Sequence, residues 1–261
     1  MYQRRSVLKG IGTVAVFSTV GVGTTAARGG GEAKLRVAHA SPDAPAVDVY
    51  VDGTVAVPDL EFGTVTEYLE LPEGEYEVAV NVAGTDTTVF GPVEVELDDE
   101  DYTAVALGEV ASDDTEFTVA LFEDTNGANL DHDETRVRAI HASPDAPEVD
   151  VTVNDGAATL FDGVLFGESS GYTVVPAGTY DVEVRGDTAD EDGPVVFEAE
   201  DVTLEGRSTY TVFALGYLTP DDEGDDAPAF FLLPTLDAGA PPRGRGRGRD
   251  GNEGRGRGRG R

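Results

Sequence analysis

The heptapeptide His39-Ala40-Ser41-Pro42-Asp43-Ala44-Pro45 occurs twice in this chain, and the second copy runs from His141 to Pro147. The two copies are identical and lie 102 positions apart. A match of this length at one fixed spacing indicates a repeated structural unit. A chain of 261 residues suits one large domain or two small ones, and the duplication favours two domains of about 100 residues each.

Further matches follow each heptapeptide in the same order. The turn Pro72-Glu73-Gly74 with Tyr76 is matched by Pro176, Gly178 and Tyr180 in the second repeat. The offset between matching residues grows from 102 to 104 and then to 108 along the repeat. Insertions therefore fall between the matched segments, where surface loops tolerate them.

Each repeat consists of short apolar segments separated by turn residues, a pattern typical of an all-β domain. Val47, Val49 and Val51 alternate with polar residues, and the segment ends at the turn signal Asp52-Gly53. In the first repeat, strands are expected at residues 35–39, 47–51, 64–71, 76–82, 93–97, 102–107 and 117–122. About seven strands per repeat predict two tandem immunoglobulin-like (transthyretin-like) β-sandwich domains with disordered termini.

The sequence divides into six predicted parts. They are a signal peptide at 1–27, a lead-in at 28–34, the first β-sandwich repeat at 35–123, an acidic linker at 124–135, the second β-sandwich repeat at 136–237, and a disordered Arg/Gly-rich tail at 238–261.

The N-terminal segment has the features of an export signal. Arg4-Arg5-Ser6-Val7-Leu8-Lys9 resembles the twin-arginine motif. The apolar run that follows is too short for a stable membrane span, and Thr25-Ala26-Ala27 offers small residues for cleavage. These features predict export of the folded protein by the twin-arginine translocase. The mature chain is expected outside the cell or at the cell surface, without a stable membrane span.

Charge is the strongest compositional signal. The formal net charge is −33, and residues 35–240 hold 48 acidic residues against five arginines and no lysine. At molar salt the Debye length falls to about 3 Å, so such a surface no longer repels itself and stays hydrated. The composition therefore predicts a protein adapted to high salt, with an acidic, cation-buffering surface protein at ordinary salt as the rival. The absence of cysteine excludes disulfides and thiolate sites.

The opening of each repeat resembles a known family. Leu35-Arg36-Val37-Ala38 leads into the first heptapeptide, and Val47-Asp48-Val49-Tyr50-Val51-Asp52-Gly53 follows it. Together with Phe62-Gly63 and the Pro-x-Gly-x-Tyr turn, this is similar to the domain-of-unknown-function family 4397. The resemblance implies an exported or surface protein, often with tandem copies and with no activity attached to the family. The second copy departs mildly, since Thr152 stands where the first has Tyr50.

His39 and His141 are two of the three histidines, and a hairpin between the flanking strands allows two registers. If its turn centres between Asp43 and Ala44, His39 faces Asp48 across the strands. A half-step shift places His39 on the apolar face, where the ring is buried and bonded to backbone. The second register is favoured because it keeps the apolar faces together.

The heptapeptide is best interpreted as a rigid turn, because Pro42 presets φ while Ser41 and Asp43 can bond local backbone. A hydrolase built on Ser41, His39 and Asp48 is a further hypothesis, disfavoured because no oxyanion motif accompanies it. No catalytic residue and no cofactor is predicted. The structural motif comprises His39, Ser41, Pro42, Asp43, Pro45, Asp48, His141, Ser143, Pro144, Asp145, Pro147 and Asp150.

The linker offers oxygen ligands at Asp124, Asn126, Asp131 and Asp133. Ca²⁺ prefers six to eight such oxygens, but no Glu stands at position twelve of a loop that starts at Asp124. A solvated linker is therefore favoured, and Ca²⁺ binding is the alternative.

The tail between Arg243 and Arg261 alternates Arg with Gly. It has almost nothing apolar to bury and is expected to be disordered. Its expected partners are envelope or extracellular polyanions or acidic proteins. The sequence as a whole favours a non-enzymatic structural or interaction module, with a small-ligand or Ca²⁺-binding module as the alternative.

Overall fold

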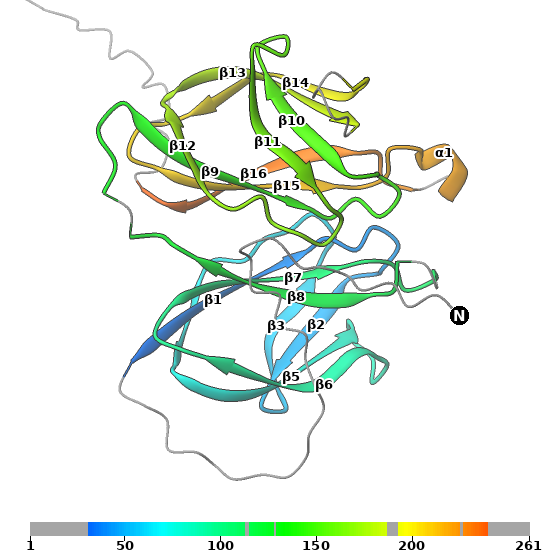
Figure 1. Cartoon of the computed structure of the whole chain (residues 1–261). Helices are drawn as coiled ribbons and strands as arrows, with labels where there is room; N and C mark the ends of the chain where they lie inside the picture. The colour runs from blue at the N-terminus through cyan, green and yellow to red at the C-terminus, as the bar shows by residue number, and fades with distance from the viewer. Residues whose placement is uncertain (1–30, 113–114, 128, 187–192, 225–226, 240–261) are drawn as a thin grey trace, which may run out of the picture.

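The computed structural model of the chain describes residues 31–112, 115–127, 129–186, 193–224 and 227–239. These residues form sixteen β-strands and one four-residue helix (Figure 1), which confirms the predicted all-β class. Within them, no helix has the length and apolar character needed to cross a membrane. The predicted signal peptide at 1–27, residues 28–30 of the lead-in, and the tail beyond residue 239 lie outside the described residues, whereas residues 32–34 of the lead-in belong to the first strand.

Each repeat supplies eight strands. The first contains β1 (Glu32–His39), β2 (Val47–Val51), β3 (Thr54–Leu60), β4 (Leu69–Pro72), β5 (Gly74–Val82), β6 (Thr88–Leu97), β7 (Asp101–Leu107) and β8 (Thr118–Asp124). The second contains β9 (Glu134–His141), β10 (Val149–Val153), β11 (Ala158–Val164), β12 (Thr173–Pro176), β13 (Gly178–Gly186), β14 (Val195–Leu204), β15 (Thr209–Leu215), α1 (Pro220–Glu223) and β16 (Phe231–Ala238). The strand missing from the sequence prediction is β3, which follows the expected turn at Asp52-Gly53, and the strand predicted at 64–71 is reduced to β4.

The strands of each repeat form two four-stranded sheets. In the first repeat the orders are β4-β1-β7-β8 and β3-β2-β5-β6, and in the second they are β12-β9-β15-β16 and β11-β10-β13-β14. β1 pairs with β7 in parallel, as β9 does with β15, whereas the other strand pairs are antiparallel. The predicted tandem sandwiches are therefore confirmed, and their strand order is the same in both repeats.

The heptapeptide connects the two sheets of a sandwich rather than two strands of a hairpin. β1 pairs with β4 and β7, while β2 pairs with β3 and β5. Both hairpin registers expected for His39 were therefore wrong. Pro42 and Pro45 have no backbone N–H, so the segment cannot continue a ladder between β1 and β2, and it crosses to the opposite sheet.

A second connection between sheets is closed by a tyrosine. The Pro72-Glu73-Gly74 turn joins β4 to β5, and the hydroxyl of Tyr76 donates to the carbonyl of Pro72. In the second repeat the Tyr180 hydroxyl donates to Pro176 O at 2.6 Å. This resembles the tyrosine corner of immunoglobulin-type sandwiches, in which a hydroxyl fixes the backbone a few residues upstream.

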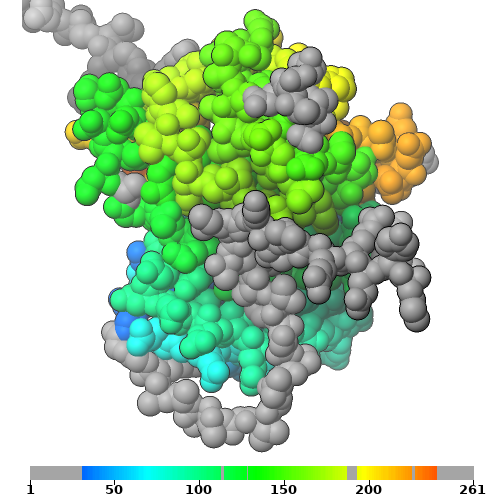
Figure 2. Space-filling view, in the orientation of Figure 1, coloured from blue at the N-terminus to red at the C-terminus, as the bar shows by residue number. Residues whose placement is uncertain are grey.

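The two sandwiches are stacked face to face (Figure 1), and their described residues form one continuous body (Figure 2). Both faces of the inner sheets are buried. On β7, Ala104 and Ala106 pack inside the first sandwich, while Val105 and Leu107 belong to a separate apolar cluster with residues of β9 and β15, such as Ile140. A sheet covered on both sides has nearly continuous apolar strands, which explains the uninterrupted run of apolar residues at the end of β7. The molecule therefore has four sheet layers with an apolar core at each of the three contacts.

Candidate functional site

The histidine of each heptapeptide is buried against the connection between sheets that the same heptapeptide forms. His39 is 1% exposed, with Nε2 3.1 Å from Pro45 O, and Nδ1 accepts from Ser41 N at 3.4 Å. Its ring lies edge-on to Phe62 with centroids 6.2 Å apart. His141 has the same contacts at 3.0 and 3.3 Å. These bonds place the proton on Nε2 and leave both ring nitrogens engaged with backbone, which is the buried arrangement that the sequence favours.

Burial lowers the pKa of His39 and His141 below the ordinary value of about 6.5, against the opposing effect of their bonds to Pro45 and Pro147. We expect both rings to stay neutral in the folded protein as the pH falls through 6.5. The unfolded chain binds these protons first, so the free energy of unfolding should decrease from pH 6.5 downward through the folded pKa values. Imidazole C–H chemical shifts in an H132A variant, which retains only these two histidines, would measure both pKa values. Titration at or above pH 6.5 would contradict the arrangement.

The heptapeptide aspartate binds the loop that follows the parallel partner strand, which is β7 in the first repeat and β15 in the second. Asp43 accepts from Val110 N and Ala111 N, both at 2.9 Å. In the second repeat Asp145 accepts from Leu218 N at 2.9 Å and Thr219 N at 2.8 Å. Burial raises the pKa of Asp145, but these hydrogen bonds more than offset it, so the pKa lies below its ordinary value.

The residues of the hydrolase hypothesis are not assembled into a relay. The Ser41 hydroxyl donates to Asp43 at 3.3 Å. The Asp48 carboxylate accepts from Asp59 N at 2.8 Å and Gly84 N at 3.0 Å, and these bonds lower its pKa. In the second repeat, Asp150 accepts from Gly163 N at 2.9 Å. The Asp48 and Asp150 carboxylates therefore bind backbone N–H groups, within a strand at Asp59 and Gly163 and in a turn at Gly84.

The residues that join the repeats were not predicted from the sequence. Arg36 of β1 is 1% exposed, and its guanidinium donates to Asp237 of β16 at 2.7 Å, across the contact between the sandwiches. Arg138 of β9 is 2% exposed and pairs with Asp124 of β8 in the opposite direction. In each ion pair, therefore, the arginine belongs to one repeat and the aspartate to the other. The available signal was the occurrence of Arg36 and Arg138, at equivalent positions, within the mostly apolar segments 35–39 and 137–141.

Hydroxyl groups complete both crossed ion pairs. Arg36 Nε donates to Thr103 at 2.8 Å, and Arg138 Nε donates to Thr211 at 2.9 Å. Tyr68 donates to Asp124 at 2.6 Å, and its equivalent Tyr172 donates to Asp237 at 2.8 Å. The guanidinium of Arg36 lies over the Tyr68 ring, 4.9 Å from its centroid, and that of Arg138 lies 4.6 Å from the Tyr172 centroid. Burial raises the pKa of both tyrosines, so they remain neutral donors.

The sequence suggested that Asp124 belongs to a solvated linker, but the structure shows that it does not. It is the last residue of β8, 1% exposed, and it accepts from Arg138, Tyr68 and Thr103. Of the other Ca²⁺ candidates, Asn126 donates to the Tyr68 hydroxyl at 3.0 Å and to Asp101 at 2.9 Å. Asp131 and Asp133 are exposed. The described part of the chain contains no group of three or more histidines and carboxylates arranged to hold a metal ion.

Fold and junction together define a tandem β-sandwich protein whose two domains are joined face to face by an apolar core and crossed ion pairs. The chain belongs to the family described as Domain of unknown function (DUF4397), whose model matches residues 33–152 and again residues 135–249. This confirms the resemblance found in the repeat openings. No curated protein matches the chain.

Among solved structures, a leucine-rich repeat protein from Bacteroides thetaiotaomicron matches over 66% of this chain at 16% identity, with a TM-score of 0.17. The chain spans 25% of that protein's length. A TM-score this low supports no structural argument.

Proposed function

We propose that this protein is an exported, salt-adapted, non-enzymatic structural and interaction module of the cell surface or the medium. The observation that carries the proposal is the junction between the repeats. Crossed ion pairs and a shared apolar core fix the two sandwiches to each other, so the pair can act as one rigid body. The hydrogen bonds of the heptapeptide residues in both copies stabilise the connections between the sheets of each sandwich.

The outer strands support adaptation to salt. On β6, Glu94 and Glu96 point outward and are exposed, while Val95 between them is 8% exposed and packs inside the sandwich. Acidic side chains along an edge strand discourage pairing with another chain. Such a surface keeps the protein soluble where salt screens its self-repulsion.

In this proposal the Arg/Gly tail is the contact segment. The acidic body and the tail between Arg243 and Arg261 carry opposite charge, so the tail can bind polyanions that the body repels. Salt weakens each such contact, and many arginines acting together are needed to retain binding in brine. The proposed partners are envelope or extracellular polyanions or acidic proteins.

Deletion of residues 243–261 is expected to move the mature protein from the envelope fraction into the medium. Fractionation of cells into cytoplasm, envelope and medium, followed by immunoblotting, measures this. A chain with all eight tail arginines changed to glutamine preserves the length and should behave like the deletion. An R4K/R5K variant tests export separately, because it should leave precursor inside the cell whatever the tail does. Equal envelope retention of the full chain and the deletion would refute the role of the tail.

A further inference from the structure

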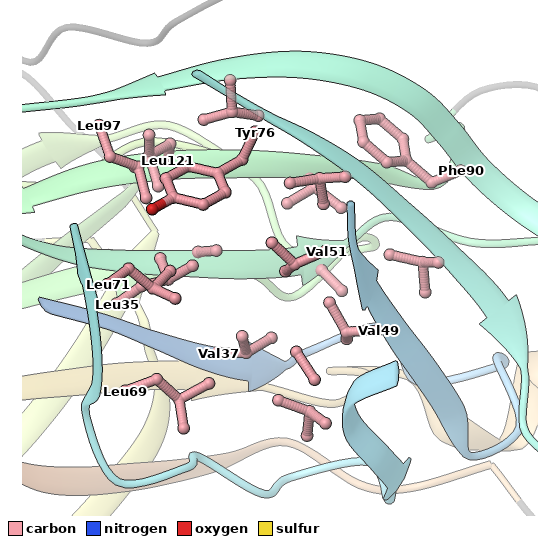
Figure 3. Close-up of a pocket in the computed structure, with 18 of the residues that line it drawn as sticks. Leu35, Val37, Val49, Val51, Leu69, Leu71, Tyr76, Phe90, Leu97 and Leu121 are labelled. Atoms are coloured by element: carbon pink, nitrogen blue, oxygen red, sulfur yellow. The ribbon is translucent and has the colours of Figure 1, made fainter. Parts of the chain in front are cut away.

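The interiors of the two sandwiches differ although their folds match. The second sandwich encloses a cavity of about 210 Å³ between its sheets, whereas the equivalent space in the first is about 50 Å³. Figure 3 shows the first interior, where Leu35, Leu71 and Tyr76 extend into the space between the strands. The extra volume is therefore a property of the second repeat and not of the fold.

At two equivalent positions the second repeat has a smaller side chain than the first. Leu35 pairs with Tyr102 on β7, and in the second repeat Val137 pairs with the matching Tyr210. Val93 pairs with Val78, whereas Ala199 pairs with Val182. Val137 and Ala199 both line the larger cavity, and together they lack three carbon atoms present in the first repeat.

The second sandwich is also more open at one edge. Tyr180 and Val202, which line the cavity, are half-buried, whereas their equivalents Tyr76 and Val95 are 3% and 8% exposed. The register of β13 and β14 shifts between Tyr180 and Val182, where β14 has one extra residue and Asp201 has a φ of 58°. A bulge of this kind bends the strand locally, and here it lies beside the cavity, next to the half-buried Tyr180 and Val202.

The lining has no free polar group to bind a polar ligand. It is formed by aliphatic side chains, Phe161, Tyr180 and His141. The Tyr180 hydroxyl is bonded to Pro176, and both His141 ring nitrogens are bonded to backbone. An apolar cavity of about 150 Å³ in another protein stays free of water and binds benzene. By that measure, about 210 Å³ accommodates about eight non-hydrogen atoms.

We propose that the interior of the second sandwich is a binding site for a small uncharged apolar molecule, such as an alkylbenzene or a short alkyl chain. This function is additional to the structural role of the body and does not depend on the tail. The first sandwich, with its filled interior, is the comparison inside the same molecule.

Toluene is a suitable probe, and the two buried histidines report on it. His141 lines the cavity of the second sandwich, whereas His39 does not line the interior space of the first. Toluene added to the H132A chain should shift the His141 imidazole signals saturably and leave those of His39 in place. Equal shifts at both histidines, or no saturable shift at His141, would overturn the proposal.

A V137L/A199V variant transfers the first repeat's side chains into the cavity and should weaken toluene binding at least about tenfold, since one methylene in an apolar pocket has an effect of this size. The reciprocal L35V/V93A variant leaves the second cavity unchanged and should bind toluene as before. Undiminished binding by a folded V137L/A199V protein would also overturn the proposal. If that variant does not fold, the comparison of His141 with His39 in the H132A chain still decides the question.

Discussion

An Asp124→Ala variant is expected to lose about 3–5 kcal/mol of its free energy of unfolding, because removing one partner of a buried ion pair leaves an uncompensated charge. Arg138, 2% exposed, would lose its carboxylate partner, and the hydroxyls of Tyr68 and Thr103 would lose their acceptor. Arg36 Nε, 3.8 Å from the same carboxylate, would be affected as well. Urea denaturation in molar KCl measures the loss.

The neighbouring Glu123→Ala variant is a matched control, because Glu123 lies on the same strand with an exposed side chain and its loss should cost less than about 0.5 kcal/mol. Asp237→Ala should resemble Asp124→Ala, since Asp237 accepts from Arg36, Thr211 and Tyr172 in the equivalent arrangement. A loss at Asp124 no larger than that at Glu123 would show that the crossed ion pairs do not hold the repeats together.

The contacts at this junction between the repeats could not be predicted from the sequence. Arg36 and Asp237 are 201 positions apart, and their contact depends on how two separate sheets face each other. Neither local periodicity nor turn chemistry carries that information. The sequence showed only that Arg36 and Arg138 each lie within a mostly apolar segment, and a charged residue there can mark either an edge that faces solvent or a buried ion pair.

Turns were predicted more reliably because their determinants are local. Asp52 and Gly53 have φ values of 50° and 70°, as a tight turn between β2 and β3 requires. Asn154, Asp155 and Gly156 take φ values of 55°, 59° and 73° at the equivalent place. The sequence signal at each site is the presence of Asn, Asp or Gly, the residues that tolerate this backbone region.

Strand pairing was predicted least well. β1 was expected to pair with β2, its neighbour in sequence, but its parallel partner β7 begins more than sixty residues later. The prolines of the heptapeptide prevent the local pairing without specifying the distant one. β3 was missed because five of its seven residues are exposed, so it lacks the regular alternation of a half-buried strand.

The junction also has the symmetry of a two-fold interface. Each repeat presents an arginine, an aspartate, a threonine and a tyrosine at equivalent positions, and every arginine bonds its own repeat's threonine and the other repeat's aspartate. Such reciprocal contacts are the property of an isologous dimer interface, here contained within one chain. Both repeats must be present for either ion pair to form.

Lowering the KCl concentration from 1 M to 0.1 M is expected to destabilise the folded protein by several kcal/mol. The Debye length rises from about 3 Å to about 10 Å over this range, so the exposed carboxylates of a chain with a net charge of −33 begin to repel one another. Two repulsive pairs are defined by register, since Glu75 lies opposite Glu96 and Glu77 opposite Glu94 on the exposed face of β5 and β6. Thermal and urea unfolding at a series of KCl concentrations measure the change.

An E94Q/E96Q variant tests whether surface repulsion is the cause. Each like-charged pair directly opposite across strands costs roughly 0.2–1 kcal/mol, so the variant should be more stable than the unmodified chain by about 0.4–2 kcal/mol at 0.1 M KCl and nearly equal to it at 1 M. The loss caused by Asp124→Ala should instead change little with salt, because buried pairs are screened much less than exposed ones. A folded state whose stability is constant or falls as KCl rises would contradict adaptation to salt, since the outward carboxylates would then have no repulsion for the ions to relieve.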